Sequence, residues 1–558
     1  MNINATYLET TTSVRVTVSK WVRSAGFAIT TLIVAQLFSA SIFAQGNVSN
    51  DQVIIVKEFE GKIKDADKVN FPPNVPEEET RSPKQTYQVP QRDFKDIPFE
   101  PNPLRPISMT KEKLERFNSS YLKLGFGSQL TPLAELVYND NKTKNLRFGG
   151  FYHHLSQYGF AIKNMRYSDD RVGVYASYIS GGVEITPEFQ FHNLRTHFYG
   201  TTENFAAKDV RQNLRDYDVQ LKLRNVLKNK VDIDYEAAVR FNYFQETFGK
   251  SNEWFVNGHV GGEKVFKKYH RAFADFRFDI SKFHSTEQDR FRNIFLLKLG
   301  YAFNNDDWKA RGAITLGADG SKFLPLPDLY IEKRLFKHQI IAFAQWEVRF
   351  QKNSYKSLAE VNNFVNSNLE LQNTQISDFG AGLKGTVQQF TYVLKFQYRR
   401  FSQMPLFYTN YFDTKRFYVA YDPTVSAFGA NIEMGWKLNE SFSVMALADM
   451  NFYSLSRNAR AWYEPALRFN WSATYNWKQK ISATLDLYAF SKYYAPLAPG
   501  VERGINGTAD LSLHLQYFFS KRWTFFGDLN NMAHQRYERW AGYKVFGVNG
   551  LVGVKFSF

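Results

Sequence analysis

The side chains that could carry out chemistry in this sequence are few and scattered. The 558 residues include 10 histidines and no cysteine, which excludes thiolate metal sites and disulfides. His153 and His154 are neighbours, but successive side chains of a strand point to opposite faces, so they cannot easily ligate one metal ion. Residues 283–287 combine histidine, serine and glutamate, yet nothing nearby completes a nucleophilic triad. We therefore expect no metal, no cofactor and no enzymatic activity.

The sequence also lacks the patterns of nucleotide and nucleic-acid binding. It has no Gly-x-x-x-x-Gly-Lys-Ser/Thr loop, and Gly125 and Gly127 lack the third glycine and the helix of a dinucleotide site. The net charge of +16, from 70 Lys and Arg against 54 Asp and Glu, could suggest RNA binding. However, the charges alternate with aromatic residues and so lie on the opposite face from them. We expect no nucleic-acid partner.

Instead, polar residues occupy every second position of extended segments. Between residues 511 and 519, Leu, Tyr and Phe take the odd positions, while Ser512, His514 and Gln516 take even ones. A period of two gives one face suited to lipid and one suited to water. The same pattern recurs in residues 217–224, 235–241, 274–280 and 467–477.

The polar face is the candidate functional surface. Ten residues are expected by alternation to face a lumen: Lys222, Arg224, Arg240, Arg277, Lys395, Gln397, Arg399, Arg468, Asn470 and His514. Their excess of positive charge leads to the hypothesis that an open lumen would favour anions. The alternative is that they hydrogen-bond across a filled lumen, since wide barrels need interior scaffolding.

These segments predict an all-β fold, a transmembrane antiparallel β-barrel of about 22 strands over residues 119–558. Each segment has about ten residues, the length that a tilted strand needs to cross a bilayer. Short and long connections alternate, as in a barrel with one end in the periplasm and one outside. A soluble sandwich would also alternate, but it accounts less well for so many strands and for aromatic strand ends such as Trp436, Trp477 and Tyr517.

Residues 1–44 have the layout of a signal peptide. The apolar run 27–44 follows Lys20 and Arg23 and ends in small residues, so we expect cleavage after Ala44. An uncleaved anchor is the alternative. No later run approaches the roughly 20 apolar residues of a membrane helix, and the mean hydropathy is -0.41.

Residues 45–118 are expected to form an extended, proline-rich periplasmic segment. Nine of the 18 prolines lie between Pro72 and Pro106, where they disfavour a helix or a central strand. Residues 52–57 are a short β-branched run, long enough for one strand and too isolated to fold alone.

The C-terminal hairpin combines Asn530 and Asn531 on the penultimate strand, Tyr537 soon after them, and a closing Phe558. In this it resembles the last two strands of TonB-dependent receptors. The resemblance implies an outer-membrane barrel of a Gram-negative bacterium, in contact with lipid and lipopolysaccharide. The last strand also looks like the C-terminal signal that the barrel-assembly machinery recognises on its clients, carried here by Val554, Phe556 and Phe558.

The resemblance stops ahead of the barrel. Receptors of this family have a folded plug of well over a hundred residues, whereas about 74 residues separate Ala44 from Ser119. We therefore expect a barrel without a plug domain, similar to TonB-dependent-receptor-like barrels of Bacteroidota. A TonB-box-like strand for a periplasmic partner is predicted within residues 51–118, at Val53, Ile54, Ile55 and Val56. The alternative is an apolar segment docked on the barrel floor or on another periplasmic protein.

Two functions follow from this architecture. The first is an outer-membrane transport or channel barrel with an unidentified substrate. The alternative is a non-conducting structural or accessory subunit of an outer-membrane assembly for secretion, protein insertion or envelope attachment. An outer-membrane hydrolase is a third hypothesis, which would need Ser/His or Asp/His groups at the outer rim.

Overall fold

The computed structural model describes residues 120–140, 145–200, 205–227, 229–320, 322–336, 338–410 and 412–558. The expected signal peptide at 1–44 and the proline-rich segment at 45–118 lie outside the described residues. The same holds for the strand predicted at 52–57, and with it for Val53, Ile54, Ile55 and Val56.

Twenty-two strands form one antiparallel sheet. From β1 to β19 each strand pairs with the next one along the chain, and β22, β23 and β26 continue the series. Their bounds are β1 Tyr121–Gly127, β2 Thr131–Asp140, β3 Leu146–Tyr158, β4 Arg166–Ser180, β5 Val183–His197, β6 Arg211–Asn225, β7 Asp234–Glu246, β8 Ser251–Phe266, β9 His270–His284, β10 Asp289–Asn304, β11 Trp308–Asp319, β12 Lys322–Phe336, β13 Ile340–Gln351, β14 Thr374–Val387, β15 Phe390–Thr409, β16 Phe417–Lys437, β17 Phe442–Leu455, β18 Leu467–Trp477, β19 Ile481–Phe490, β22 Thr508–Phe518, β23 Trp523–Asn530 and β26 Asn549–Ser557.

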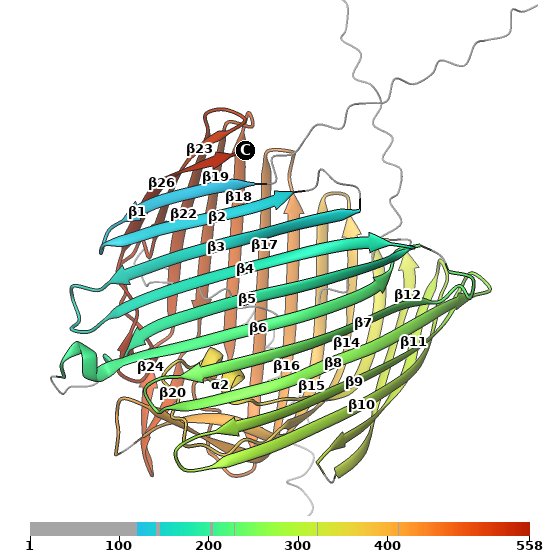
Figure 1. Cartoon of the computed structure of the whole chain (residues 1–558), viewed down its shortest axis with the longest axis horizontal. Helices are drawn as coiled ribbons and strands as arrows, with labels where there is room; N and C mark the ends of the chain where they lie inside the picture. The colour runs from blue at the N-terminus through green and yellow to red at the C-terminus, as the bar shows by residue number, and fades with distance from the viewer. Residues whose placement is uncertain are drawn as a thin grey trace, which may run out of the picture. The chain divides into compact units, whose positions relative to one another are not determined.

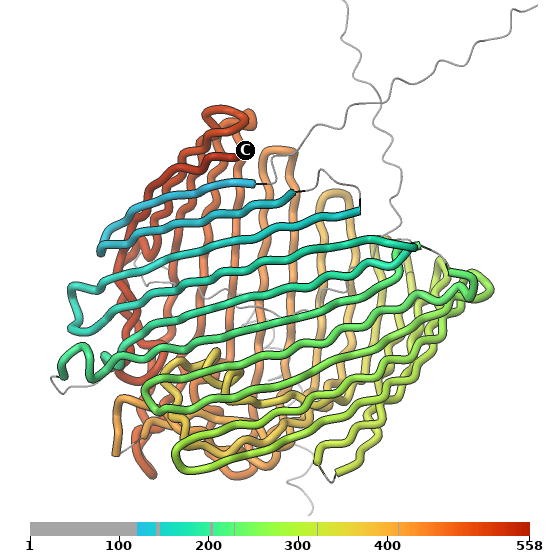
Figure 2. The backbone as a smooth tube through the Cα atoms, viewed as in Figure 1, coloured from blue at the N-terminus to red at the C-terminus, as the bar shows by residue number. Residues whose placement is uncertain are grey.

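The pairing of β26 with β1 closes the sheet into a barrel. Tyr121 lies opposite Ser557, and the backbone N–H of Phe558 donates to the carbonyl of Ser120 at 2.9 Å. The first and last strands lie side by side in Figure 1, and Figure 2 shows the chain passing once around the ring between them. A closed ring leaves no unpaired sheet edge.

The two faces of the wall differ as the sequence pattern predicts. On β6, Val219 and Leu221 are 50% and 51% exposed, whereas Asp218 between them is 8% exposed. This face with exposed apolar side chains is the outer face, because residues of the other face, such as Leu214, pack against loops inside one end of the barrel. The expected all-β antiparallel barrel of about 22 strands is confirmed.

The two ends of the barrel also differ. The terminal end, where β1 begins and β26 ends, has short turns such as 181–182 and 388–389. The opposite end, here called the loop end, carries the longest connections and the small elements within them. These are the 3-10 helix η1 Ala207–Val210, α2 Tyr355–Val361, the hairpin β20 Tyr493–Ala498 with β21 Val501–Ile505, and the hairpin β24 Glu538–Trp540 with β25 Tyr543–Lys544. The labels α2, β20 and β24 mark this end in Figure 1. Among the residues placed by the structure, no helix has both the length and the apolar character to cross a membrane.

Candidate functional site

The loops at the loop end fold together into one body, here called the cap. The cap consists of residues 198–200, 205–210, 352–373, 456–466, 491–507 and 531–548. It packs against inward side chains of distant strands, including Phe244 of β7, Phe283 of β9 and Phe407 of β15. Because these strands stand at different places around the ring, the cap crosses the loop end of the barrel.

An apolar cluster forms the centre of the cap. Its buried cap members are Phe198, Val210, Tyr355, Leu358, Ala359, Phe364, Val365, Leu369, Tyr463, Tyr493, Ala495, Ile505, Trp540, Ala541 and Tyr543. Burial of a large apolar side chain contributes about 1.5–3 kcal/mol, so this cluster stabilises the closed arrangement of the loops.

Phe364 and Tyr543 stack in the middle of this cluster. Their ring centroids are 3.7 Å apart and the planes differ by 19°. Gly200 allows the contact, because a Cβ at this position would lie 2.4 Å from the Tyr543 ring. Gly542 faces it with a φ of +84°, in the left-handed region that glycine adopts without strain. Side chains at these glycines would separate the loops.

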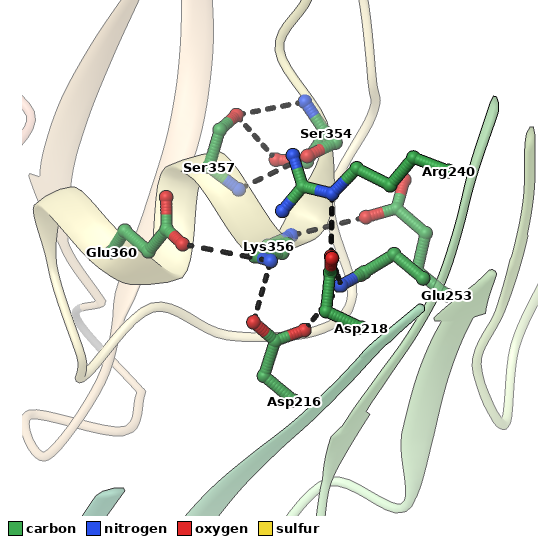
Figure 3. Close-up of polar contacts among 9 residues, drawn as sticks. Asp216, Asp218, Arg240, Glu253, Ser354, Lys356, Ser357 and Glu360 are labelled. Atoms are coloured by element: carbon green, nitrogen blue, oxygen red, sulfur yellow. Dashed lines mark hydrogen bonds and ion pairs between the residues drawn. The ribbon is translucent and has the colours of Figure 1, made fainter. Parts of the chain in front are cut away.

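Helix α2 anchors the cap to the barrel wall (Figure 3). Ser354 begins the helix with a capping box, in which its side chain accepts from the backbone N–H of Ser357 at 3.0 Å. Lys356 is the anchor: its Nζ lies 2.6 Å from Asp216 Oδ2, and its backbone N–H donates to Glu253 Oε2 at 3.1 Å. The lysine and aspartate side chains are only 11% and 16% exposed.

Side chains of the barrel wall hydrogen-bond Asp216, the partner of Lys356, and the nearby Asp218. The side-chain amide of Asn242 donates to Asp216 Oδ1 at 2.6 Å and to Asp218 Oδ2 at 2.8 Å, and Arg240 Nε lies 2.5 Å from Asp218 Oδ2. These contacts join β6 and β7 and orient the two carboxylates independently of α2 (Figure 3). A buried carboxylate left without its cation is strongly destabilising, so Lys356 couples the cap to the wall.

Hydrogen bonds between the loops lock the cap further. Tyr199 Oη donates to the carbonyl of Lys544 at 2.9 Å. Tyr493 Oη donates to the carbonyls of Glu538 and Arg539 at 2.8 and 3.0 Å. The segments 198–200 and 491–507 are thus both hydrogen-bonded to the backbone of the segment 531–548.

Two ionisable groups, Tyr463 in the cap and Asp413 in the loop next to it, have shifted pKa values. Burial raises the pKa of Tyr463 to about 12, although its hydroxyl also contacts Thr409 Oγ1 at 3.1 Å. Burial would raise the pKa of Asp413, but hydrogen bonds from Arg416 and Lys415 outweigh it and hold that pKa below its usual range. The phenol is thus neutral and the carboxylate charged near neutral pH.

Most of the ten residues expected to face the lumen have a partner on the same strand or on a neighbouring strand or loop. The ion pairs are Lys222–Glu188 at 3.0 Å, Arg224–Glu184 at 2.6 Å, Arg240–Asp218 at 2.5 Å, Arg277–Asp275 at 2.5 Å, Lys395–Asp378 at 3.5 Å, Arg468–Glu464 at 2.6 Å, and His514–Asp528 at 2.8 Å. Arg399 donates to Asn451 Oδ1, Gln397 is buried, and Asn470 is exposed.

These ten residues do not form one pocket. They are spread over β6, β7, β9, β15, β18 and β22, and among them Arg240 belongs to the network that holds the α2 anchor. The carboxylates beside the cations offset their positive charge, as the interpretation of interior scaffolding requires.

The sequence patterns did not predict the cap. Its available signal was the aromatic density of loop segments such as Trp462-Tyr463 and Trp540 to Tyr543.

The remaining sequence candidates occupy separate places. Phe556 packs on Trp523 at 4.6 Å between ring centroids and stacks with Phe558 at 5.9 Å, on the same strand as Val554. In residues 283–287, Ser285 Oγ contacts the carbonyl of Gln288 rather than the neighbouring histidine. Within the described ranges, no group of three or more His, Asp or Glu could hold a metal ion.

Comparisons with known proteins find solved structures of the same architecture. The FrpB iron transporter from Neisseria meningitidis matches with a TM-score of 0.64 at 8% identity, over 79% of this chain and 81% of that one. The ferric enterobactin receptor PfeA from Pseudomonas aeruginosa gives 0.62 at 9%, over 79% and 81%. The ferric-catecholate import receptor Fiu from E. coli K12 gives 0.61 at 9%, over 79% and 82%.

The barrel has the fold of these receptors. The agreement extends the TonB-dependent-receptor resemblance of the C-terminal hairpin to the whole barrel, at the level of architecture. No protein-family model and no curated protein matches the sequence.

Proposed function

We propose that this chain is an outer-membrane transport barrel related to TonB-dependent receptors, without a plug domain and with a gated loop end. The observation that carries the proposal is a closed 22-strand barrel with an exposed apolar outer wall and a cap tied across its loop end. Its solved structural neighbours are iron transporters and import receptors.

The outer wall supports the membrane location. Large apolar side chains remain exposed on many strands, among them Phe126, Val260, Phe396, Phe452 and Val552, each 58% to 67% exposed. A soluble protein rarely exposes apolar patches beyond a few hundred Å², whereas a membrane barrel needs such a band. Lipid and lipopolysaccharide are the partners of this surface.

The terminal end is proposed to face the periplasm. Residues 1–44 would be removed on export and residues 45–118 would lie in the periplasm, with 51–118 engaging a periplasmic partner. The exposed aromatic edge of the last strand fits recognition by the barrel-assembly machinery. In this orientation a substrate meets the cap first, and opening the cap exposes a wall lined by the ion-paired side chains described above.

The alternative function is a non-conducting accessory subunit of an outer-membrane assembly. The observation in its favour is the same cap, because Lys356, Gly200 and the apolar cluster fix it in place. A barrel that is closed permanently could serve as a structural member.

Conductance distinguishes the two functions. The full-length protein and a variant with residues 355–371 replaced by a Gly-Ser linker of equal length would be compared in planar bilayers. We expect the parent to conduct rarely and the variant to conduct continuously, because the helix and its Lys356 anchor are gone. A substitution of the exposed outer residue Phe379 by leucine is the matched control and should behave as the parent.

A barrel in which the linker replaces residues 355–371, and which is folded and still non-conducting, would contradict the transport proposal and favour the accessory subunit. Folding is checked by heat-modifiable migration in gels, a property that both proteins should share.

A further inference from the structure

The outer face of β3 and β4 carries a serine, a histidine and an aspartate in one hydrogen-bonded series. Ser156 Oγ lies 3.3 Å from His154 Nε2, and His154 Nδ1 lies 2.6 Å from Asp170 Oδ1. When Nδ1 carries the hydrogen and donates to Asp170, Nε2 accepts the hydroxyl hydrogen of Ser156. This is the order of contacts in a nucleophilic triad, which is recognised by geometry rather than by sequence position.

Strand geometry brings the three residues together. His154 and Ser156 are two positions apart on β3 and therefore share a face, and Asp170 of β4 lies opposite His154 in the register. The strands β3 and β4 lie side by side in Figure 1. Asp170 is oriented in turn, because its Oδ2 accepts from Ser168 Oγ at 3.2 Å and from Asn193 Nδ2 at 3.3 Å.

The group can be reached from outside the barrel. The side chains of His154 and Asp170 are 26% and 28% exposed. Their face is the outer one, since two positions away on the same strands lie Tyr152 and Val172, and beyond them Val174 is 53% exposed. A substrate lying along the wall would contact the series directly.

An apolar surface begins one row from the triad. Tyr152, Val172, Phe191 and Tyr217 are paired in register across β3 to β6, about 7 Å from the triad row along the strands. Phe191 and Tyr217 contact each other at 4.9 Å between centroids. Toward the terminal end the same face stays apolar, as exposed side chains such as Phe148 show. The acyl chains of a lipid can therefore contact an apolar surface on the terminal-end side of Ser156.

Cations stand on the other side of the triad. Arg195 lies opposite Ser168 in the register, in the row of Ser156. Arg166, one row closer to the loops, places its guanidinium 4.3 Å from the centroid of the Tyr158 ring and donates to its hydroxyl at 2.7 Å. Apolar rows on one side and arginines on the other match a lipid with acyl chains and an anionic head.

We propose that Ser156, His154 and Asp170 form a serine esterase site that hydrolyses the acyl ester of an anionic membrane lipid. The esterase chemistry stands on the triad geometry alone, whereas the choice of a lipid substrate rests on the membrane location proposed above. The proposal departs from the expectation that the chain has no enzymatic activity, which agrees with the transporters and receptors among its structural neighbours.

The reaction has two balanced halves. Ser156 Oγ attacks the ester carbonyl carbon while His154 Nε2 takes the hydroxyl proton. The ester C–O bond then breaks, and His154 returns the proton to the departing alcohol. Water attacks the resulting acyl-serine while His154 Nε2 takes one of its protons. The acyl–Oγ bond then breaks to release a fatty acid, and His154 returns the proton to Ser156 Oγ, which regenerates the serine. Asp170 is the positioning residue that holds the imidazole through Nδ1–H.

The experiment uses the full-length protein in detergent micelles. A fluorophosphonate probe is added first, and the modified residue is identified by peptide mass spectrometry. Two lipid arms follow: mixed micelles of dioleoylphosphatidylglycerol, with release of oleate, and lipopolysaccharide aggregates, with release of hydroxylated fatty acids. We expect the probe on Ser156 and fatty acid release in one arm, and the productive arm identifies the lipid source.

Two variants make the result specific. Ser156→Ala should abolish labelling and reduce fatty acid release to background. His153→Gln is the matched control, since this neighbouring histidine faces inward and contacts Glu135 Oε1 at 3.1 Å, and it should retain full activity.

The proposal is overturned if neither lipid is hydrolysed above the Ser156→Ala background by protein that migrates as a folded barrel, whether or not the probe reacts. Release of fatty acid that persists in the alanine variant would overturn it equally. Neither outcome affects the conductance test, so failure of this site and failure of the transport proposal are distinguishable.

Discussion

The inner and outer faces of β3, β4 and β5 carry two histidine–aspartate pairs whose aspartates are adjacent in the sequence. On the inner face, His192 Nε2 lies 3.0 Å from Asp169 Oδ1. On the outer face, His154 Nδ1 lies 2.6 Å from Asp170 Oδ1. The pairs differ in their third member, which is Arg171 inside and Ser156 outside.

This third member decides what each pair can do. Arg171 makes two contacts with Asp169, at 2.9 Å from Nε and 2.6 Å from Nη2, so the inner carboxylate serves as a counter-ion. The outer carboxylate accepts instead from the uncharged side chains of Ser168 and Asn193. Its histidine turns the other ring nitrogen to the hydroxyl of Ser156. The same residue types thus give scaffolding on one face and a nucleophile on the other, and the predictions below test that division.

The largest effect is expected from the two aspartates themselves. Asp170→Asn should reduce kcat/KM for lipid ester hydrolysis by about 10⁴-fold, because the amide favours the wrong histidine tautomer. Asp169→Asn should leave hydrolysis unchanged and lower the stability of the barrel to denaturant.

Labelling by fluorophosphonate distinguishes positioning from a merely structural role. The labelling rate and its pH profile should change in Asp170→Asn and recover in part in Asp170→Glu. Equal loss of hydrolysis in the Asp169 and Asp170 variants would remove the distinction between the two faces.

The next-largest effect is expected at the ion pair between Lys356 of the cap and Asp216 on the inner face of β6. Lys356→Met should leave Asp216 buried without its cation, a cost of about 3–5 kcal/mol, and this should raise the open population of the cap by about 10²-fold or more. The measurement is open probability in planar bilayers. The double variant Lys356→Met with Asp216→Asn is the control and should close again, because no unpaired charge remains. Ester hydrolysis should not change in either variant.

Much of this fold could be predicted from the sequence, because alternation is a local signal. Every second residue of 511–519 is apolar, and the structure places those from Leu511 to Tyr517 on the outer face of β22. Closure of the barrel was predictable from the C-terminal strand with its aromatic Phe558. In the structure this strand, β26, pairs with β1. Local patterns of this kind identify strands, faces and their approximate number.

The sites were less predictable because they depend on which residues lie opposite each other. The partner of His154 is 16 positions away in Asp170, and only the register of β3 with β4 brings them together. The cap depends on contacts such as Phe364 with Tyr543, far apart in the chain and without any periodic signal. Residues 283–287 place a histidine and a serine side by side in the sequence but do not form a hydrogen-bonded series, whereas Ser156, His154 and Asp170 form one across two strands.

A smaller effect is expected at the arginine beside the triad. Arg195→Gln should reduce kcat/KM for the anionic lipid by about tenfold, the worth of one charge-assisted hydrogen bond, mainly through KM. Hydrolysis of an uncharged short-chain ester should be unaffected. A matched loss for both substrates would show that Arg195 supports the fold of the outer face rather than the lipid head.

The smallest effect is a pH dependence of cap closure, which concerns the interior of the barrel and not the outer-face residues Ser156, His154 and Asp170. The pKa of Tyr463 is raised to about 12 in the closed cap, against about 10 for an exposed tyrosine. Its neutral form is therefore favoured in the closed state, so its contribution to closure is complete below about pH 10 and is lost as the pH rises toward 12. Conductance of the parent protein should increase over this range. Tyr463→Phe cannot ionise and should show a smaller increase, with the residual rise due to the other buried tyrosines of the cap, such as Tyr493. Identical curves of conductance against pH for the two proteins would show that the cap opens without exposing Tyr463. Tyr463 and the loops around Trp540 would then move together as one unit.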